Sequence, residues 1–252
     1  MYISGSGLLT SLSRQDAFTS NLANVNTVGF KPLVPTVRQR DVASVEDGLP
    51  QMASNRLLEQ LGAGALLGPS QVSFKPGPLI EGGELDVAIE GEGFFVVEGG
   101  GVGGPRLTRD GRLALDDRGR LVQAASGRAM LGAGGQPVFL PRDTPVEIDA
   151  EGRIYDAEGR VLAQLSVVDV ADRWRLAPEG EGLLGAPAGV LENAVPATGR
   201  VAHRYVESSA VDPIDALRDI TSAASAVSAN TAMIDFQDRL MDRAINALGR
   251  VT

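Results

Sequence analysis

Near the N-terminus, apolar and polar positions alternate with the spacing of a helix. Leu8, Leu12, Phe18 and Leu22 return to one side at helical steps, and polar residues fill the positions between them. This pattern predicts a helix over residues 5–25 with one face turned toward a partner.

The stretch SNLANVNTVGFKP, residues 20–32, predicts the end of that helix. Asn24, Asn26 and Gly29 tolerate a left-handed backbone, and Pro32 prevents the helix from restarting. We expect a positive φ at Gly29, because it follows a helix end and precedes an aromatic residue and a proline. Taken alone, the stretch is an ordinary helix C-terminus.

The most regular pattern lies at the C-terminus. Asp212 is suited to cap a helix, Pro213 to occupy its first position, and Asp215 to complete a start that is similar to a capping box. Because the positions after them recur at alternating steps of three and four, they predict an a/d seam that needs a second helix beside it. The seam positions are Leu217, Ile220, Ala224, Val227, Thr231, Ile234, Asp238, Met241, Ile245 and Leu248.

Residues 33–71 carry weaker signals. A short helix is conceivable at residues 57–61, but Gly62, Gly64 and Gly68 weaken it. We interpret most of this stretch as an extended connection.

Residues 72–206 show the alternation of β-strands. Leu85, Val87 and Ile89 alternate with other residues, and a turn at 91–93 leads into the apolar run that starts at Phe94. Asp110–Gly111 and residues 117–119 are further turn signals between apolar runs.

Two more patterns extend the β prediction. The sequence DAEGR occurs at residues 149–153 and again at 156–160, each time before an apolar pair, which is typical of hairpins. The stretch LAQLSVVDV, residues 162–170, predicts a longer strand. Many short antiparallel strands are therefore expected.

These patterns predict an α+β fold. Its helical domain contains the N-terminal helix with its cap (residues 1–32) and the C-terminal helix (207–252), packed together like a coiled coil. The extended connection (33–71) and the antiparallel β domain (72–206) lie between them.

Composition narrows the functional classes. The chain has 252 residues, no cysteine and a formal net charge of −9. The absence of cysteine excludes disulfides, thiolate zinc sites and a cysteine nucleophile. An acidic chain without a Lys/Arg stripe is a poor candidate for binding nucleic acid. No apolar run reaches the length of a membrane span, and the first residues lack the features of a cleaved signal peptide.

Candidate chemistry is sparse. Gly99, Gly101 and Gly104 fit a dinucleotide-binding spacing, but Pro105 and a strand follow instead of a helix, so we expect a hairpin tip. His203 is the only histidine and cannot form a common zinc site by itself. We find no catalytic constellation and expect neither a metal nor a cofactor.

Four ordered stretches resemble the bacterial flagellar rod and hook proteins. They are SGLLTSLSRQDAFTSNLANVNTVGFKP near the start, LDVAIEGEGFFVV, LTRDGRLALDDRGRLV, and YVESSAVDPIDALRDI before the last helix. The family's motif and turn positions correspond here to Asn24, Asn26, Thr27, Gly29, Phe30, Gly91, Gly93, Phe94, Asp110 and Gly111. The chain departs from the family pattern at residues 224–227, where ASAV replaces Gln-Arg-Ala-Tyr.

The resemblance implies a structural subunit of the flagellar basal-body rod in the periplasm, exported by the type III apparatus without a cleaved signal. Its implied partners are copies of itself, other rod proteins, the export apparatus and the surrounding ring proteins, with no nucleic acid and no membrane insertion. The opening MYISGSG favours a proximal position in the rod, with a distal position as the alternative. The expected assembly contacts are Leu8, Leu12, Phe18, Leu22, Leu217, Ile220, Ala224, Val227, Ile234, Met241, Ile245 and Leu248.

Two other classes remain open from the residues alone. One is a monomeric β-domain that binds a ligand and whose end helices pair only with each other. The other is a hydrolase with acidic residues, which needs two carboxylates that converge in a cleft.

Overall fold

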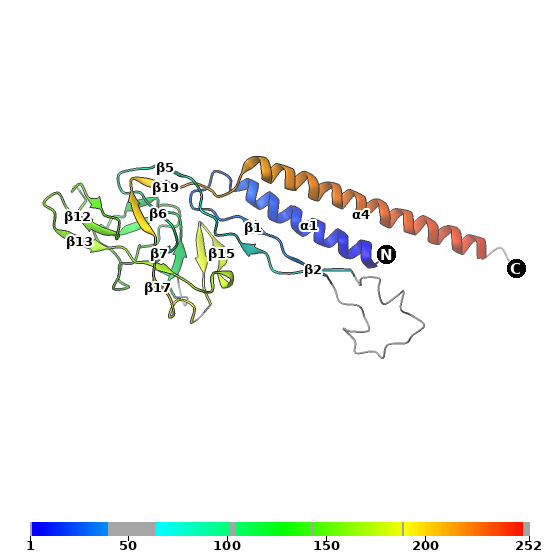
Figure 1. Ribbon diagram of the computed structural model, residues 1–252, viewed down its shortest axis with the longest axis horizontal. Helices are drawn as coiled ribbons and strands as arrows, with labels where there is room; N and C mark the ends of the chain where they lie inside the picture. Colours follow the sequence, from blue (N-terminus) through cyan, green and yellow to red (C-terminus); the bar gives the residue numbers. More distant parts are fainter. Residues whose placement is uncertain (1, 40–63, 101–103, 143, 188, 249–252) are drawn as a thin grey trace. The chain divides into compact units, whose positions relative to one another are not determined.

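The chain forms two compact units, one mainly helical and one built of β-strands. The computed structural model describes residues 2–39, 64–100, 104–142, 144–187 and 189–248. We call the two parts the helical unit (residues 1–23, 33–71 and 212–252) and the β unit (residues 24–32 and 72–211). An α+β fold is thus confirmed (Figure 1).

This division differs from the predicted domain bounds at two places. The segment 24–32, which we expected to accompany the N-terminal helix, groups with the β unit. Residues 207–211 do so as well. The β unit therefore joins two pieces of chain that are far apart in sequence.

The helical unit contains two long helices whose ends follow from local sequence. Helix α1 spans Tyr2–Ala23 and helix α4 spans Pro213–Leu248. The Asp212 carboxylate accepts the backbone N–H groups of Ile214 at 2.8 Å and Asp215 at 3.2 Å. This confirms Asp212 as the N-cap, because its Oδ1 satisfies two of the free amides of the first turn.

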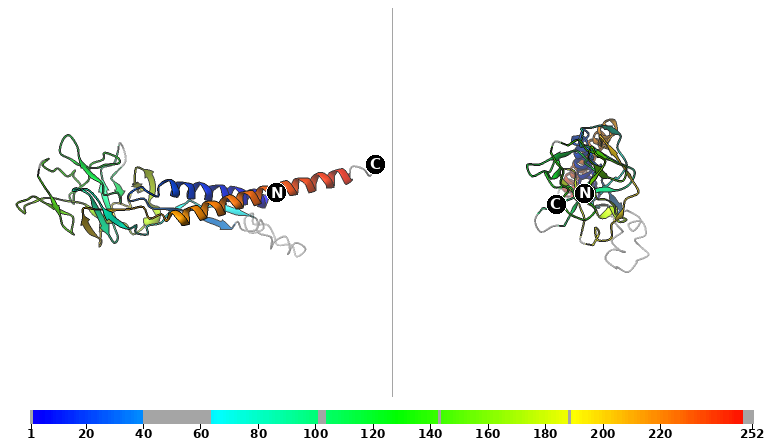
Figure 2. Two further views of the ribbon diagram at one scale, coloured as in Figure 1. Left: turned by 90° about the horizontal axis from the view of Figure 1, so that it is seen from above. Right: turned by 90° about the vertical axis from the view of Figure 1, so that its left-hand side faces the viewer.

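The two helices lie side by side and run in opposite directions (Figures 1 and 2). Ser11 lies opposite Asn230, and Ser4 lies opposite Gln237. Continuing this register places Tyr2 near Arg239, so the part of α4 from Leu240 onward extends past the start of α1 (Figure 1).

Short strands complete the described part of the helical unit. Strands β2 (Val37–Gln39) and β3 (Ala65–Leu67) pair antiparallel. Strand β1 (Leu33–Val34) follows the segment 24–32, and the Asn21 side chain bonds both the N–H and the C=O of Leu33. The short helix considered at residues 57–61 lies outside the described residues.

The β unit is made of short strands, as expected. Most pair antiparallel in one six-stranded sheet, a three-stranded sheet and several two-stranded ribbons. The chain first forms β4 (Gln71–Val72), β5 (Leu79–Glu81), β6 (Val87–Glu90), β7 (Phe94–Val97), β8 (Arg106–Thr108), β9 (Leu113–Leu115), β10 (Leu121–Gln123) and β11 (Glu147–Ile148). It continues with β12 (Arg153–Tyr155), β13 (Val161–Gln164), β14 (Val167–Asp169), the 3₁₀ helix η2 (Arg173–Arg175), β15 (Ala177–Gly180), β16 (Leu183–Gly185), β17 (Val195–Pro196), β18 (Arg200–His203) and β19 (Tyr205–Glu207).

One turn type forms three of the hairpins. In the sequence Asp-x-x-Gly-Arg, the Asp side chain accepts the backbone N–H groups two and four residues later, as Asp156 does from Glu158 at 3.0 Å and Arg160 at 2.8 Å. The same turn occurs at Asp116 and Asp149. The two DAEGR stretches join β11 to β12 and β12 to β13, which confirms the hairpin prediction.

One prediction about the strands was wrong. The stretch 162–170 is not one long strand: β13 and β14 belong to different sheets, because the chain changes sheets at Leu165, whose side chain enters the core. The turn at Asp110–Gly111 leads from β8 to β9, which lie in different sheets. Strand β8 pairs with β7 and β16, whereas β9 pairs with β10.

The core of the β unit consists of two clusters of buried side chains. One includes Val87, Phe95 and Ile154, and the other is centred on Phe94 and Leu107. Phe94 and Phe95 follow each other on β7 and enter different clusters, because successive strand residues point to opposite faces. Strand β7 is thus buried on both faces and holds the two clusters together.

Both edges of the six-stranded sheet contain a proline. The strand order is β15-β16-β8-β7-β14-β17, with Pro178 on β15 and Pro196 on β17. Proline has no N–H to donate and blocks the regular addition of a further strand. The sheet edges are therefore poor sites for association with another chain.

Candidate functional site

Three of the stretches that carry the family resemblance meet at a buried carboxylate. Glu207 ends strand β19 and is 1% exposed. Lys31 Nζ lies 2.6 Å from its Oε1, and Arg109 Nη1 lies 3.2 Å from its Oε2. The Gly77 N–H also donates to Oε1, at 2.8 Å. We call Lys31, Arg109 and Glu207 the ion cluster; all three belong to the β unit.

Backbone carbonyls and an aromatic ring bind the remaining sides of the two cations. Lys31 Nζ donates to the carbonyl oxygen of Lys75 at 2.8 Å. Arg109 donates to the carbonyl oxygen of Gly91 at 2.8 Å, and its guanidinium lies 5.3 Å from the ring centre of Phe94. Only Arg109 Nε is buried without a hydrogen-bond partner in the described part of the cluster.

The cluster contains two cations for one carboxylate. Burial lowers the pKa of Lys31, and the hydrogen bond and charge of Glu207 oppose this shift. Burial likewise lowers the pKa of Arg109, again opposed by Glu207. Because ionised side chains lose their hydration here, each cation depends on the one shared carboxylate.

Gly29 connects the N-terminal motif to the residues of the ion cluster. Its φ is +69°, which confirms the positive value expected from the sequence. Its N–H donates to the backbone oxygen of Glu207 at 2.7 Å. A β-carbon on Gly29 would lie 2.5 Å from the backbone nitrogen of Asp110, so the segment 24–32 packs directly against the loop that carries Arg109.

The preceding asparagine turn is closed by short hydrogen bonds. The Thr27 N–H donates to the carbonyl oxygen of Asn24 at 3.0 Å, and the two side chains join at 3.1 Å. Asn26 is exposed, and Phe30 is half-buried with its carbonyl accepting the Ala210 N–H. The motif residues therefore shape the segment that delivers Lys31 to Glu207.

Asp110 and Gly111 hold the Arg109 loop in place. The buried Asp110 carboxylate binds the Arg112 guanidinium at 2.7 Å, and its backbone N–H donates to Thr108 Oγ1 at 3.0 Å. The Gly111 carbonyl accepts the Val87 N–H at 2.9 Å. A β-carbon on Gly111 would lie 1.7 Å from the Val87 oxygen, which requires glycine where the chain passes from β8 to β9.

Gly91 and Gly93 lie in the turn between β6 and β7. A β-carbon on Gly93 would lie 2.4 Å from the β-carbon of Ala197, and one on Gly91 would lie 3.3 Å from Gly199. Phe94 follows, fully buried beneath the Arg109 guanidinium. This turn thus supplies both a carbonyl and a ring to the ion cluster.

The second candidate site is the pair of helices α1 and α4, which contact each other through polar side chains, among others. Asn230 Nδ2 lies 3.5 Å from Ser11 Oγ, and Gln237 Nε2 lies 3.4 Å from Ser4 Oγ. A β-carbon on Gly7 would come within 2.9 Å of Asn230 Oδ1. The other buried positions of the pair are small or polar: Thr10, Ala17, Asn21, Ala216 and Ala223.

Large apolar side chains of these helices face outward instead. Met241 is 55% exposed and Ile245 is 65% exposed. The others in this group are Ile3, Leu9, Leu12, Ile214, Leu217, Met233, Phe236 and Leu240. The fully buried positions of the pair are therefore small or polar, whereas many of its large apolar side chains are exposed.

Some of the expected assembly contacts are exposed, and others are half-buried. Leu12, Leu217, Met241 and Ile245 are exposed. The half-buried ones are Leu8, Phe18, Leu22, Ile220, Ala224, Val227 and Ile234. The side chain of Leu248 lies outside the described residues. The polar contacts Ser4, Ser11, Asn230 and Gln237 were missed, since hydrophobic periodicity does not reveal them.

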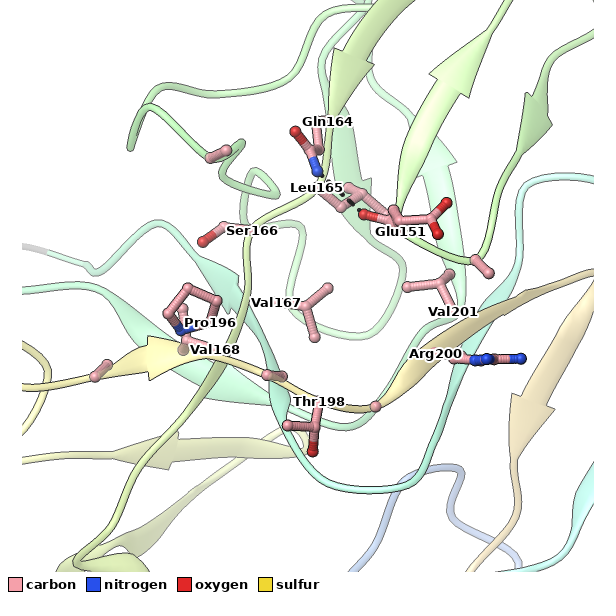
Figure 3. A pocket seen from close by; sticks show the side chains of 15 residues that line it. Glu151, Gln164, Leu165, Ser166, Val167, Val168, Pro196, Thr198, Arg200 and Val201 are labelled. Carbon is pink, nitrogen blue, oxygen red and sulfur yellow. Dashed lines mark hydrogen bonds between the residues drawn. The ribbon is translucent and has the colours of Figure 1, made fainter.

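The β unit also has an open cavity of about 620 Å³ (Figure 3). Gln164, Ser166, Thr198 and Arg200 line it together with small apolar residues. The Gln164 amide donates to the carbonyl oxygen of Glu151 at 3.2 Å. The lining contains no paired carboxylates that could serve as general acid and base.

Metal and histidine chemistry finds no support in the described residues. Within them, no group of three or more His, Cys, Asp or Glu side chains could hold a metal ion. His203 Nε2 lies 2.7 Å from the Glu84 carbonyl oxygen, and its Nδ1 accepts the Ile148 N–H at 3.5 Å. Nor is any helix in this part of the chain long and apolar enough to cross a membrane.

Comparison with known families agrees with the motifs. The family described as "Flagella basal body rod protein" matches residues 1–31. The family described as "Flagellar hook protein FlgE/F/G D1 domain" matches residues 88–155. The first match contains Gly29 and Lys31, and the second contains Arg109.

Curated relatives extend the likeness along almost the whole chain. The flagellar basal-body rod protein FlgF of Caulobacter vibrioides is 28% identical, with 100% of this chain and 98% of the relative covered. FlgG of Bacillus subtilis is 27% identical, with 98% and 97% covered. FlgF of Salmonella typhimurium is 29% identical, with 84% and 83% covered. The chain is thus similar, along almost its whole length, to bacterial flagellar basal-body rod proteins.

Proposed function

We propose that the chain is a structural subunit of the flagellar basal-body rod and assembles with its neighbours through the helical unit. The observation that supports this is the exposed apolar surface of the helices: Ser4 contacts Gln237 of the partner helix, whereas the large side chains of Met241 and Ile245 face outward. Burial of a large apolar side chain contributes about 1.5–3 kcal/mol. Covering this surface with neighbouring subunits would therefore stabilise an assembly substantially.

The outward apolar residues favour helical neighbours in particular. The expected seam continues to Ile245 and Leu248, past the point where α1 begins. A long helix with an unpaired apolar stripe is suited to a coiled-coil-like bundle formed with other subunits. The neighbours proposed are copies of this chain and other rod proteins, and the surrounding ring proteins are further partners. No catalytic role is proposed.

We place the chain in the proximal part of the rod, in the periplasm, after export by the type III apparatus without a cleaved signal. The likeness to FlgF and the opening MYISGSG support the proximal position. The likeness to FlgG over 98% of the chain makes the distal rod the alternative. Cross-linking in isolated basal bodies, followed by identification of the adjacent rod proteins, distinguishes the two positions.

Substitution of the outward apolar residues tests the assembly role. The double variant Met241→Ser/Ile245→Ser should remain soluble but should enter basal bodies poorly and reduce motility. A matched control is Val161→Ser, which removes a similarly exposed apolar side chain from β13 in the β unit. Normal incorporation of the double variant would contradict assembly through this surface.

The second candidate is a monomeric ligand-binding module, and the cavity in Figure 3 is the observation that favours it. Arg200 and Thr198 would supply its polar contacts. In that case the substitution Thr198→Trp, which fills the cavity, should impair function, whereas the α4 double variant should not. The opposite result supports the rod subunit.

A further inference from the structure

The ion cluster joins the first and last parts of the β unit. Lys31 and Glu207 are 176 positions apart in sequence. Lys31 lies next to the last residue of the segment 24–32, which follows α1, and Glu207 lies six residues before the start of α4. Between them the chain forms residues 33–71 of the helical unit and most of the β unit, so their contact can exist only when both ends of the β unit are in place.

Backbone hydrogen bonds also hold the segment 24–32. It contains no strand of its own. Its long-range backbone bonds are those from Gly29 to Glu207 at 2.7 Å, from Ala210 to Phe30 at 3.2 Å, and from Ser73 to Pro32 at 2.8 Å. Two of these three involve β19 or the residues just after it. The position of the segment therefore depends on β19.

Because of their charges, loss of Lys31 and loss of Glu207 would affect the ion cluster differently. Without Lys31, Arg109 and Glu207 would remain as a neutral buried pair at 3.2 Å. Without the Glu207 carboxylate, two cations would be left buried with no anion between them. Arg173 and Asp169 also act on Arg109 through their charges, but Arg173 binds Asp169 at 2.7 Å and Glu92 at 2.9 Å. None of them replaces Glu207.

We propose that Glu207 is a closing latch: its carboxylate captures Lys31 and Arg109 in a late step of folding and holds the segment 24–32 on the β unit. Contacts of such long sequence separation are slow to form, because the entropy of closing the loop is lost before the contact is gained. A latch of this kind acts mainly on the rate of opening. The proposal concerns the single chain and does not depend on rod assembly.

Folding kinetics of the full chain test the latch. Glu207→Gln keeps the shape of the side chain but removes its charge. We expect it to accelerate unfolding on the order of a hundredfold and to leave the refolding rate nearly unchanged, because a contact formed late affects mainly unfolding. Lys31→Met should accelerate unfolding less than Glu207→Gln does. Glu81→Gln, on the neighbouring strand β5 and exposed, is the matched control and should change neither rate.

Hydrogen exchange gives an independent measurement on the unmodified chain, should Glu207→Gln fail to fold. The amides of Gly29, Gly77 and Ala210 should exchange together through a partial opening. The Val96 amide in the central sheet should exchange more slowly. Lys31→Met should accelerate exchange at the first three amides alone.

Three results would overturn the proposal. One is a slower refolding of Glu207→Gln with unchanged unfolding, which would place Glu207 in the folding nucleus. Another is an equal effect of Glu207→Gln and Lys31→Met. The third is exchange of Gly29 and Val96 at the same rate, which would mean that the segment opens only when the whole β unit unfolds.

Discussion

Gly29 packs against the backbone of Asp110 so closely that a β-carbon would lie 2.5 Å from the Asp110 nitrogen. This contact joins the motif after α1 to the loop after β8. Together with the φ of +69°, it gives two separate reasons for glycine at this position.

The first prediction separates these two reasons. Gly29→Ala should lower the free energy of unfolding by clearly more than the roughly 1 kcal/mol of backbone strain, because the rigid backbone of Asp110 must also move. Gly127→Ala is the matched control: its φ is +66°, but nothing lies within 4 Å of the added carbon. Urea unfolding measures both variants, and equal losses would show that the close contact carries no cost.

The second prediction concerns acid stability. The backbone N–H and side chain of Arg120 lower the pKa of Asp116 from 3.8 to about 2. A carboxylate with a lowered pKa in the folded state stabilises it above the ordinary pKa and loses this contribution as the pH falls. Part of the stability of the β unit should therefore be lost between about pH 4 and pH 2.

Two asparagine variants test this assignment. Asp116→Asn should flatten the decline of the urea midpoint across that pH range. Asp117→Asn, which changes the exposed neighbour in the same turn, should leave the decline as it is. A decline that is identical in all three proteins would assign the acid sensitivity to other carboxylates.

Local sequence was sufficient to predict those helices and hairpins whose ends are fixed by hydrogen bonds to a side chain nearby in sequence. Asp212 revealed the start of α4, and the repeated DAEGR revealed two hairpins, since each Asp bonds amides only two to four residues away. The prediction of one strand over residues 162–170 was wrong, because the division of this stretch depends on residues far away in sequence. Its division at Leu165 is caused by packing into a core assembled from distant strands.

The ion cluster could not be predicted from spacing. Lys31, Arg109 and Glu207 read individually as surface charges, because such residues are rarely fully buried. The motifs that contain these residues were recognised in the sequence, but the motifs did not show that the three side chains meet. The polar contacts of α4 at Asn230 and Gln237 were also not predicted, because hydrophobic periodicity does not reveal polar side chains.

The third prediction tests the close contact of the two helices. Gly5 and Gly7 both lie inside α1, where alanine is favoured over glycine by up to about 1 kcal/mol. Gly5→Ala meets nothing within 4 Å and should stabilise α1. Gly7→Ala must displace the Asn230 amide, 2.9 Å away, and should gain little or lose stability. The helical circular dichroism during thermal unfolding compares the two; an equal gain would mean that α4 does not constrain Gly7.

The fourth prediction concerns export. The proposed route leads us to expect that residues 2–23 are required for secretion, so their deletion should leave the protein inside the cell. The deletion must stop at residue 23, because residues 24–32 are part of the β unit and their loss would disturb its folding as well. Immunoblots of cell and culture fractions measure the result, with a pulse-proteolysis check that the β unit is folded. Normal secretion of the truncated chain would contradict the flagellar route.

The last prediction concerns the free subunit. Polar side chains of α4 contact α1, its large apolar side chains Met233 and Phe236 are exposed, and its last turns from Leu240 onward extend past α1. Helices without an apolar packing partner are marginally stable in water. In a dilute sample proven to be monomeric, amides of residues 217–248 should therefore exchange quickly, fastest after Leu240, while those of the β unit stay protected. Assembly should slow exchange along the whole helix. Strong protection of residues 217–248 in the monomer would instead mean that the two helices form a private core, and it would favour the ligand-binding module over the rod subunit.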